Sequence, residues 1–150
     1  MPWVPGGDPG ALARLMSEKP RRYLDFLVKQ SETAQFVASV CEGALLLAAA
    51  GLLDGYRATT HLAFIPCLKR FSKIKVAKRH PRYVVDGNRI TGGGISSGLD
   101  EALAPIKKLG GSKVAKSVQR TTQYYPRPPV SSKLPVVTDC PPERPLPVPS

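Results

Sequence analysis

Residues 39–43 place a cysteine between an apolar run and a small, apolar helical segment. Residues 36–40 are typical of a buried strand, and residues 43–50 are typical of a buried helix. A strand that turns sharply into a helix holds a nucleophile clear of the backbone, in the geometry called a nucleophile elbow. Free amides and the helix dipole at such a corner favour a thiolate over a thiol. Cys41 is therefore predicted to be a nucleophile, and a cysteine that closes a buried core strand is the alternative.

Glu42 follows the candidate nucleophile directly. Its backbone amide is a natural donor to the negative charge that develops during attack. Its carboxylate fits two roles equally well: a proton donor or acceptor in the site, or a helix-start acid stabilised by the dipole. A charged carboxylate at this position would also oppose formation of the neighbouring thiolate.

The composition is that of one globular domain. The chain has 150 residues, of which 42% are hydrophobic, enough for a single core. No apolar run reaches the length of a membrane span, and the start of the chain lacks the pattern of a signal peptide. Cys41, Cys67 and Cys140 lie in dissimilar contexts, which predicts neither a disulfide framework nor a zinc site. A cytoplasmic location is expected.

The net charge of +11 raises the question of a nucleic-acid partner. The basic residues are spread over residues 69–82 and 107–120, and no recognised nucleic-acid motif accompanies them. A solvated basic surface is the favoured interpretation. His80 lies in one of these basic stretches and is predicted to be on the surface.

Strand and helix patterns alternate along the chain. Strands are predicted to end at residues 3–5 and to cover residues 36–41 and 57–60, with a hairpin at 82–85 and 89–91; helices are predicted over residues 20–35, from 42, over 63–71, 97–109 and 112–123. This alternation predicts an α/β fold with a mostly parallel sheet covered on both faces. No βα unit precedes Trp3, so the sheet is expected to be truncated at its N-terminal side. Prolines dominate residues 126–150, which predicts an extended or disordered tail.

Several segments in order resemble the PfpI/ThiJ superfamily, whose fold is like that of class I glutamine amidotransferases. They are residues 4–7, 39–45, 49–55, 57–61, 86–94 and 98–100. The ending at residues 123–129 resembles the isonitrile hydratase branch. The resemblance covers roughly residues 4–135. It implies a flavodoxin-like sandwich over residues 1–125, a homodimer, a small-molecule substrate, a cysteine nucleophile, and no metal or organic cofactor.

The isonitrile hydratase branch implies a specific reaction. These enzymes add water to R–N≡C and yield an N-substituted formamide. The resemblance implies that the Cys41 thiolate attacks the terminal carbon and forms a thioimidate, which water then opens. Such a step needs an activated sulfur, a proton donor and a dry pocket for the organic group.

The resemblance also assigns roles to residues around the sulfur. Gly6 and Gly7 match the family's Pro-Gly-Gly turn, whose amides face the nucleophile; an ordinary tight turn is the alternative. Gly43, in the cysteine motif, is assigned with them to the oxyanion and substrate-binding set. His61 lies where many relatives place a histidine, as a base for the thiol or as a residue that positions its loop. Glu42 departs from the threonine that the branch usually carries.

Two other functions remain open from the sequence. AraC-type regulators carry a similar domain with a similar cysteine corner, which makes a non-catalytic sensing domain the second hypothesis. A catalytically silent, truncated domain is the third. The family places an acidic residue near the sulfur from a segment that precedes Val4, and Asp8 does not match that position.

Overall fold

The structure, a computed structural model, describes residues 1–141. Its strands are β1 (Trp3–Val4), β2 (Val37–Ser39), β3 (Arg57–Ala58), β4 (Lys75–Val76), β5 (Tyr83–Asp86) and β6 (Arg89–Gly92). Its helices are α1 (Pro9–Ser17), α2 (Arg22–Glu32), α3 (Gly43–Ala49), the short 3₁₀ helix η1 (Leu62–Phe64), α4 (Ile65–Leu68) and α5 (Ser97–Thr121).

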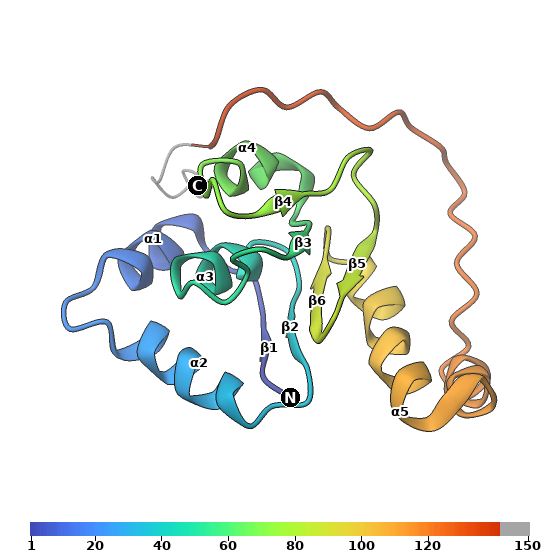
Figure 1. Ribbon diagram of the computed structural model, residues 1–150. Coiled ribbons are helices and arrows are strands. Elements are labelled where there is room, and N and C mark those ends of the chain that lie inside the picture. The colour runs from blue at the N-terminus through green and yellow to red at the C-terminus, as the bar shows by residue number, and fades with distance from the viewer. Residues whose placement is uncertain (142–150) are drawn as a thin grey trace, which may run out of the picture.

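The main sheet has the strand order β1-β2-β6-β5. The first three strands are parallel, and β5 runs antiparallel to β6 as the arm of a hairpin. In the register, Ser39 pairs with both Val4 and Thr91, so the carboxyl ends of three strands meet at one edge. Helices α1, α2 and α3 lie on one side of this sheet and α5 packs against the hairpin on the other (Figure 1). The predicted α/β fold with a mostly parallel sheet is confirmed.

The core forms between the sheet and α3. Residues from Gly43 to Ala48 are all buried, because a helix made of small and apolar residues has no polar face to turn to water. Leu47, Leu53 and Leu68 have no exposed surface and pack in the same cluster. This burial fixes α3 against β1 and β2, and so fixes the corner from which α3 starts.

Two helical regions differ from prediction, and one predicted helix break is confirmed. α1 was not predicted; Asp8 starts it by accepting the Ala11 amide at 2.8 Å, with Pro9 in the first turn. The helix predicted over residues 63–71 divides into η1 and the four residues of α4. The predicted break at the Gly-Gly pair is confirmed, because Gly111 adopts a φ of +77° and kinks α5 there.

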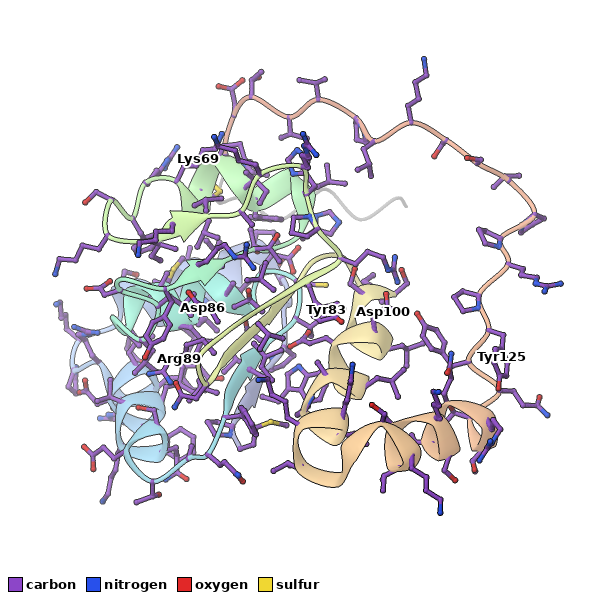
Figure 2. The ribbon with its side chains drawn as sticks, turned by 45° about the vertical axis from the view of Figure 1, so that its right-hand side comes forward. Lys69, Tyr83, Asp86, Arg89, Asp100 and Tyr125 are labelled. Atoms are coloured by element: carbon purple, nitrogen blue, oxygen red, sulfur yellow. A yellow bond between two sulfur atoms is a disulfide. The ribbon has the colours of Figure 1, made fainter. Side chains whose placement is uncertain are left out.

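A disulfide joins Cys67 and Cys140, so the prediction that the cysteines form no disulfide framework is wrong for these two residues. The two Cα atoms lie 4.9 Å apart across a sequence separation of 73 residues. The tail leaves the end of α5 near Tyr125 and arches back to α4, where Cys140 is bonded (Figures 1 and 2). Residues 126–141 form no regular structure, as predicted, and the remainder of the predicted tail, residues 142–150, lies outside the described residues.

Arg82 connects the hairpin with both ends of α5. Its guanidinium contacts the carboxylate of Asp100 and donates to the Ser96 carbonyl at 3.0 Å. The Tyr124 hydroxyl donates to the other oxygen of Asp100 at 2.9 Å. Figure 2 shows Asp100 at the start of α5, beside the hairpin strand that carries Tyr83. Within residues 1–141, no helix is long and apolar enough to cross a membrane.

Candidate active site

An open pocket of about 480 Å³ lies where β1 and β2 end. Ligands of open α/β sheets bind at the carboxyl ends of the strands, which is where this pocket lies. Its lining brings together five of the six predicted site residues: it consists of Pro5, Gly6, Gly7, Val40, Cys41, Glu42, His61 and Ile95.

Cys41 stands at the corner between β2 and α3 with a φ of +54°. This backbone conformation is strained for a residue with a side chain, at about 1–3 kcal/mol, and persists only where the surroundings fix it. Two hydrogen bonds do so here. The Cys41 amide donates to the Gly93 carbonyl at 2.8 Å, and the buried Thr60 hydroxyl donates to the Cys41 carbonyl at 2.7 Å. The strand, the hairpin end and the β3 loop therefore hold the corner together.

Burial and nearby charge oppose ionisation of the Cys41 thiol. The residue is 7% exposed, and burial raises the pKa of the thiol, with further rises from the charges of Glu42 and Glu101. These contributions act against the thiolate that a position at a helix start was expected to favour.

Gly6 and Glu42 are in contact at the rim of the pocket. A Cβ added at Gly6 would lie 2.7 Å from the Cβ of Cys41 and would meet the Glu42 carboxylate, so only glycine allows this close approach. Glu42 is the residue before α3, but its side chain makes no capping hydrogen bond to the helix. Its carboxylate instead faces the Pro-Gly-Gly turn, next to the sulfur-bearing residue.

The glycines of the predicted oxyanion set have different roles. Gly43 packs on β1: a Cβ there would lie 2.8 Å from the Pro5 carbonyl oxygen, and its amide donates to the Val40 carbonyl at 3.1 Å. The amide of Gly43 is therefore engaged within the corner. Within residues 1–141 the amides of Gly6, Gly7 and Glu42 make no hydrogen bond, so they are the donors free to face an anion.

His61 lines the pocket and lies between η1 and Gly94. Its Nδ1 accepts the Ala63 amide at 3.2 Å and starts η1. A neutral ring with Nδ1 as acceptor carries its proton on Nε2. Nε2 faces Gly94, where an added Cβ would lie 3.7 Å away. In this tautomer Nε2 is a hydrogen-bond donor. The contact of Nδ1 with the Ala63 amide fits the predicted role of positioning its loop, and the role of a base for the thiol stays a prediction.

Sequence reasoning missed Glu101, Thr60 and Gly93. Glu101 is completely buried, no side chain within residues 1–141 hydrogen-bonds to its carboxyl oxygens, and burial raises its pKa to about 8. One signal was available: Ser97, Glu101 and Pro105, spaced four apart, form the buried stripe of α5. Among the described residues no group of three His, Cys, Asp or Glu side chains could hold a metal ion.

Comparison with known proteins gives one consistent family. The DJ-1/PfpI family matches residues 3–108. The chain is 44% identical over 132 residues to an isonitrile hydratase of Pseudomonas putida. The aligned region covers 88% of this chain and 55% of that protein. It is 28% identical over 105 residues to the HTH-type transcriptional regulator GbdR of Pseudomonas aeruginosa, covering 69% of this chain and 28% of the regulator.

The fold comparison agrees. The crystal structure of a ThiJ/PfpI family protein from Pseudomonas syringae has a TM-score of 0.75 and 38% sequence identity, covering 85% of this chain and 50% of that one. The chain spans about half the length of the isonitrile hydratase and about a quarter of the regulator. With the fold, the cysteine corner and the Pro-Gly-Gly turn in place, the chain belongs to the DJ-1/PfpI family.

Proposed function

We propose that this chain is an isonitrile hydratase-like lyase that uses Cys41 as its nucleophile. The observation that carries the proposal is the positive φ of Cys41 in a pocket that Gly6, Gly7 and Glu42 also line, whose amides make no hydrogen bond within residues 1–141. The 44% identity to the Pseudomonas putida isonitrile hydratase supports the substrate class.

The reaction balances without a cofactor. Cys41 loses its proton, its sulfur bonds to the terminal isonitrile carbon, and that carbon takes up a proton, which gives a thioimidate. Water then adds to the same carbon, the C–S bond breaks, and the nitrogen and sulfur are protonated, which releases R–NH–CHO and the free thiol. His61 Nε2 and the Glu42 carboxyl group are the side chains placed to donate or carry these protons.

The pocket fits a neutral organic group. Pro5, Val40 and Ile95 supply apolar surface beside the sulfur, and the Ile95 side chain is 88% exposed at the rim. No lysine or arginine lines the pocket within residues 1–141. A neutral isonitrile needs no cationic partner, and an apolar wall lowers the local water content around the reacting carbon.

The test is formation of the formamide from cyclohexyl isocyanide, followed by chromatography. The wild-type chain should produce it, and Cys41→Ala should not. Because burial and two carboxyl groups raise the pKa of the thiol, the wild-type rate should increase with pH beyond the range of an ordinary cysteine. Equal formamide production by wild type and Cys41→Ala would refute the nucleophile.

A sensing domain is the second candidate, and the raised thiol pKa favours it, since a protonated sulfur binds without reacting. The similarity to the regulator GbdR is the second support. In that case an isonitrile raises the melting temperature of wild type and of Cys41→Ser alike, with no formamide produced. A homodimer is part of either proposal, and size-exclusion chromatography with light scattering measures it.

A further inference from the structure

Helix α5 carries a carboxyl group into the layer behind the cysteine corner. Glu101 has no exposed surface, no side chain within residues 1–141 hydrogen-bonds to its carboxyl oxygens, and the polar group that acts on it is the Ser39 backbone. The buried hydroxyl of Ser39, at the end of β2, also lacks a partner there. A buried polar group without a partner lowers the free energy of unfolding by about 1–3 kcal/mol. Such groups next to the Cys41 corner therefore call for a functional explanation.

The contacts of this carboxyl group tie it to the corner. A Cβ added at Gly92 would lie 3.0 Å from the Glu101 carboxyl carbon, so only glycine leaves it room. The next residue, Gly93, accepts the Cys41 amide. One turn earlier on α5, a Cβ added at Gly98 would lie 3.2 Å from Val40. The first turns of α5 therefore support both chain segments that hold the sulfur.

Two carboxyl groups from different elements act on the thiol: Glu42 from the start of α3 and Glu101 from α5. His61, from the residue before η1, lines the same pocket as Cys41 and Glu42. Both carboxyl groups oppose a negative charge on Cys41. No cation lines this pocket within residues 1–141 to offset them.

The other charged groups near α5 are engaged elsewhere. On β5, Asp86 accepts the Arg57 amide at 2.7 Å, and Tyr83 is exposed. On β6, Arg89 donates to the Leu52 carbonyl at 2.6 Å. On α5 itself, Asp100 is paired with Arg82. Glu101 is therefore in no ion pair within residues 1–141, and the Cys41 thiol is a reactive group that its charge affects.

We propose that Glu101 is a positioning residue that sets the ionisation of Cys41: in its neutral form it permits the thiolate, and in its charged form it opposes it. Burial raises the pKa of Glu101 to about 8, although the Ser39 backbone lowers it in part. Its charge in turn contributes to the raised pKa of the thiol. Because the charge of one group raises the pKa of the other, their titrations interact.

The test measures alkylation of Cys41 by iodoacetamide from about pH 6 to about pH 10, with peptide mapping to assign the modified cysteine. The variants are Glu101→Gln, which keeps the shape, and Glu101→Leu, which is apolar. Glu32→Gln removes an exposed carboxylate of α2 and is the control for a change in net charge. Circular dichroism confirms that each variant is folded. The readout needs no isonitrile turnover, so it does not depend on the proposed function.

For wild type we expect the alkylation rate of Cys41 to rise gradually with pH, over a wider range than the titration of a single group gives. Glu101→Gln and Glu101→Leu should steepen it and move its midpoint down by at least about half a pH unit, a roughly threefold gain in rate below the midpoint. Glu32→Gln should follow wild type. The proposal is overturned if the folded Glu101 variants have the same alkylation midpoint as Glu32→Gln, or a higher one. If Gln alone unfolds, the Leu variant and the ultraviolet titration of the wild-type thiolate decide.

Discussion

Cutting the Cys67–Cys140 disulfide should destabilise the chain less than its sequence separation suggests. In the chain-entropy account, a bridge across 73 residues restricts the unfolded chain by about 4 kcal/mol. The folded chain is restricted too, because the bridge closes the exposed tether at 126–139, roughly 14 residues that regain their freedom when it is cut. Only the difference affects stability, and (3/2)RT ln(73/14) is about 1.5 kcal/mol.

Lost packing adds to this figure. Cys140 and Pro141 line an apolar groove of about 170 Å³ together with Leu12 and Phe64. Release of the tail exposes part of that groove, which costs about 1 kcal/mol for a half-buried side chain. The expected loss for Cys140→Ser is therefore about 2.5 kcal/mol.

Urea unfolding under non-reducing conditions measures this loss, with Cys41→Ser as the control that leaves the bridge intact. The double variant Cys67→Ser/Cys140→Ser should be no less stable than Cys140→Ser alone. A loss of about 4 kcal/mol or more in the free energy of unfolding would equal the full restriction that the bridge places on the unfolded chain. It would refute the reasoning, because it would mean that the tether stays packed in the folded state after the bridge is cut. No loss at all would mean that the bridge does not form.

Further predictions concern the corner and the buried acid. Gly43→Ala should lower the free energy of unfolding by about 3 kcal/mol or more in urea titrations, because its Cβ would overlap carbonyl oxygens of β1. Gly6→Ala should lower the melting temperature and Gly7→Ala should not, because the first Cβ would meet Cys41 and the second nothing within 4 Å. The neutral form of Glu101 is the one that favours folding, since its folded pKa of about 8 lies above the unfolded value of 4.5. The contribution of neutral Glu101 to the free energy of unfolding is complete below about pH 4.5 and is lost progressively as the pH rises to about 8. At about pH 8 the free energy of unfolding of Glu101→Leu, measured in denaturant titrations, should exceed that of wild type by about 4 kcal/mol. At about pH 5 the two values should differ far less. A constant difference across this range would contradict the assignment of the proton.

The apolar patterns predicted the elements that build the site. The run ending at Cys41, the fully apolar α3 and the turn at residues 86–88 have patterns typical of a strand, a helix and a hairpin turn, so β2, α3 and the hairpin were predictable. Helix α1 was not, because its Pro9-Gly10 start is equally typical of a turn and the Asp8 cap is decisive only in three dimensions.

The electrostatics of the site could not be predicted in the same way. Helix starts favour thiolates in general, but the balance here depends on how deeply the sulfur is buried and on a carboxyl group sixty residues further along the chain. The Cys67–Cys140 bridge depends on where an irregular tail returns, and no periodic pattern encodes that path. A periodic pattern predicts which face of a helix or strand a residue occupies. It cannot predict which two side chains far apart in the sequence pair, because such a pair occurs only once.

Arg82 gives the hairpin a mechanical role. Its carbonyl accepts the Gly93 amide at 2.8 Å, and the Gly93 carbonyl accepts the Cys41 amide, also at 2.8 Å. Through Asp100, the same side chain holds Tyr124 at the root of the tail. Tension applied to the tail would therefore act on the backbone of Cys41 through these hydrogen bonds. An optical-tweezer handle attached beyond Asp139 in a bridge-free variant would pull on this linkage while the Tyr124 hydroxyl, which is one of its hydrogen-bonding groups, stays in place.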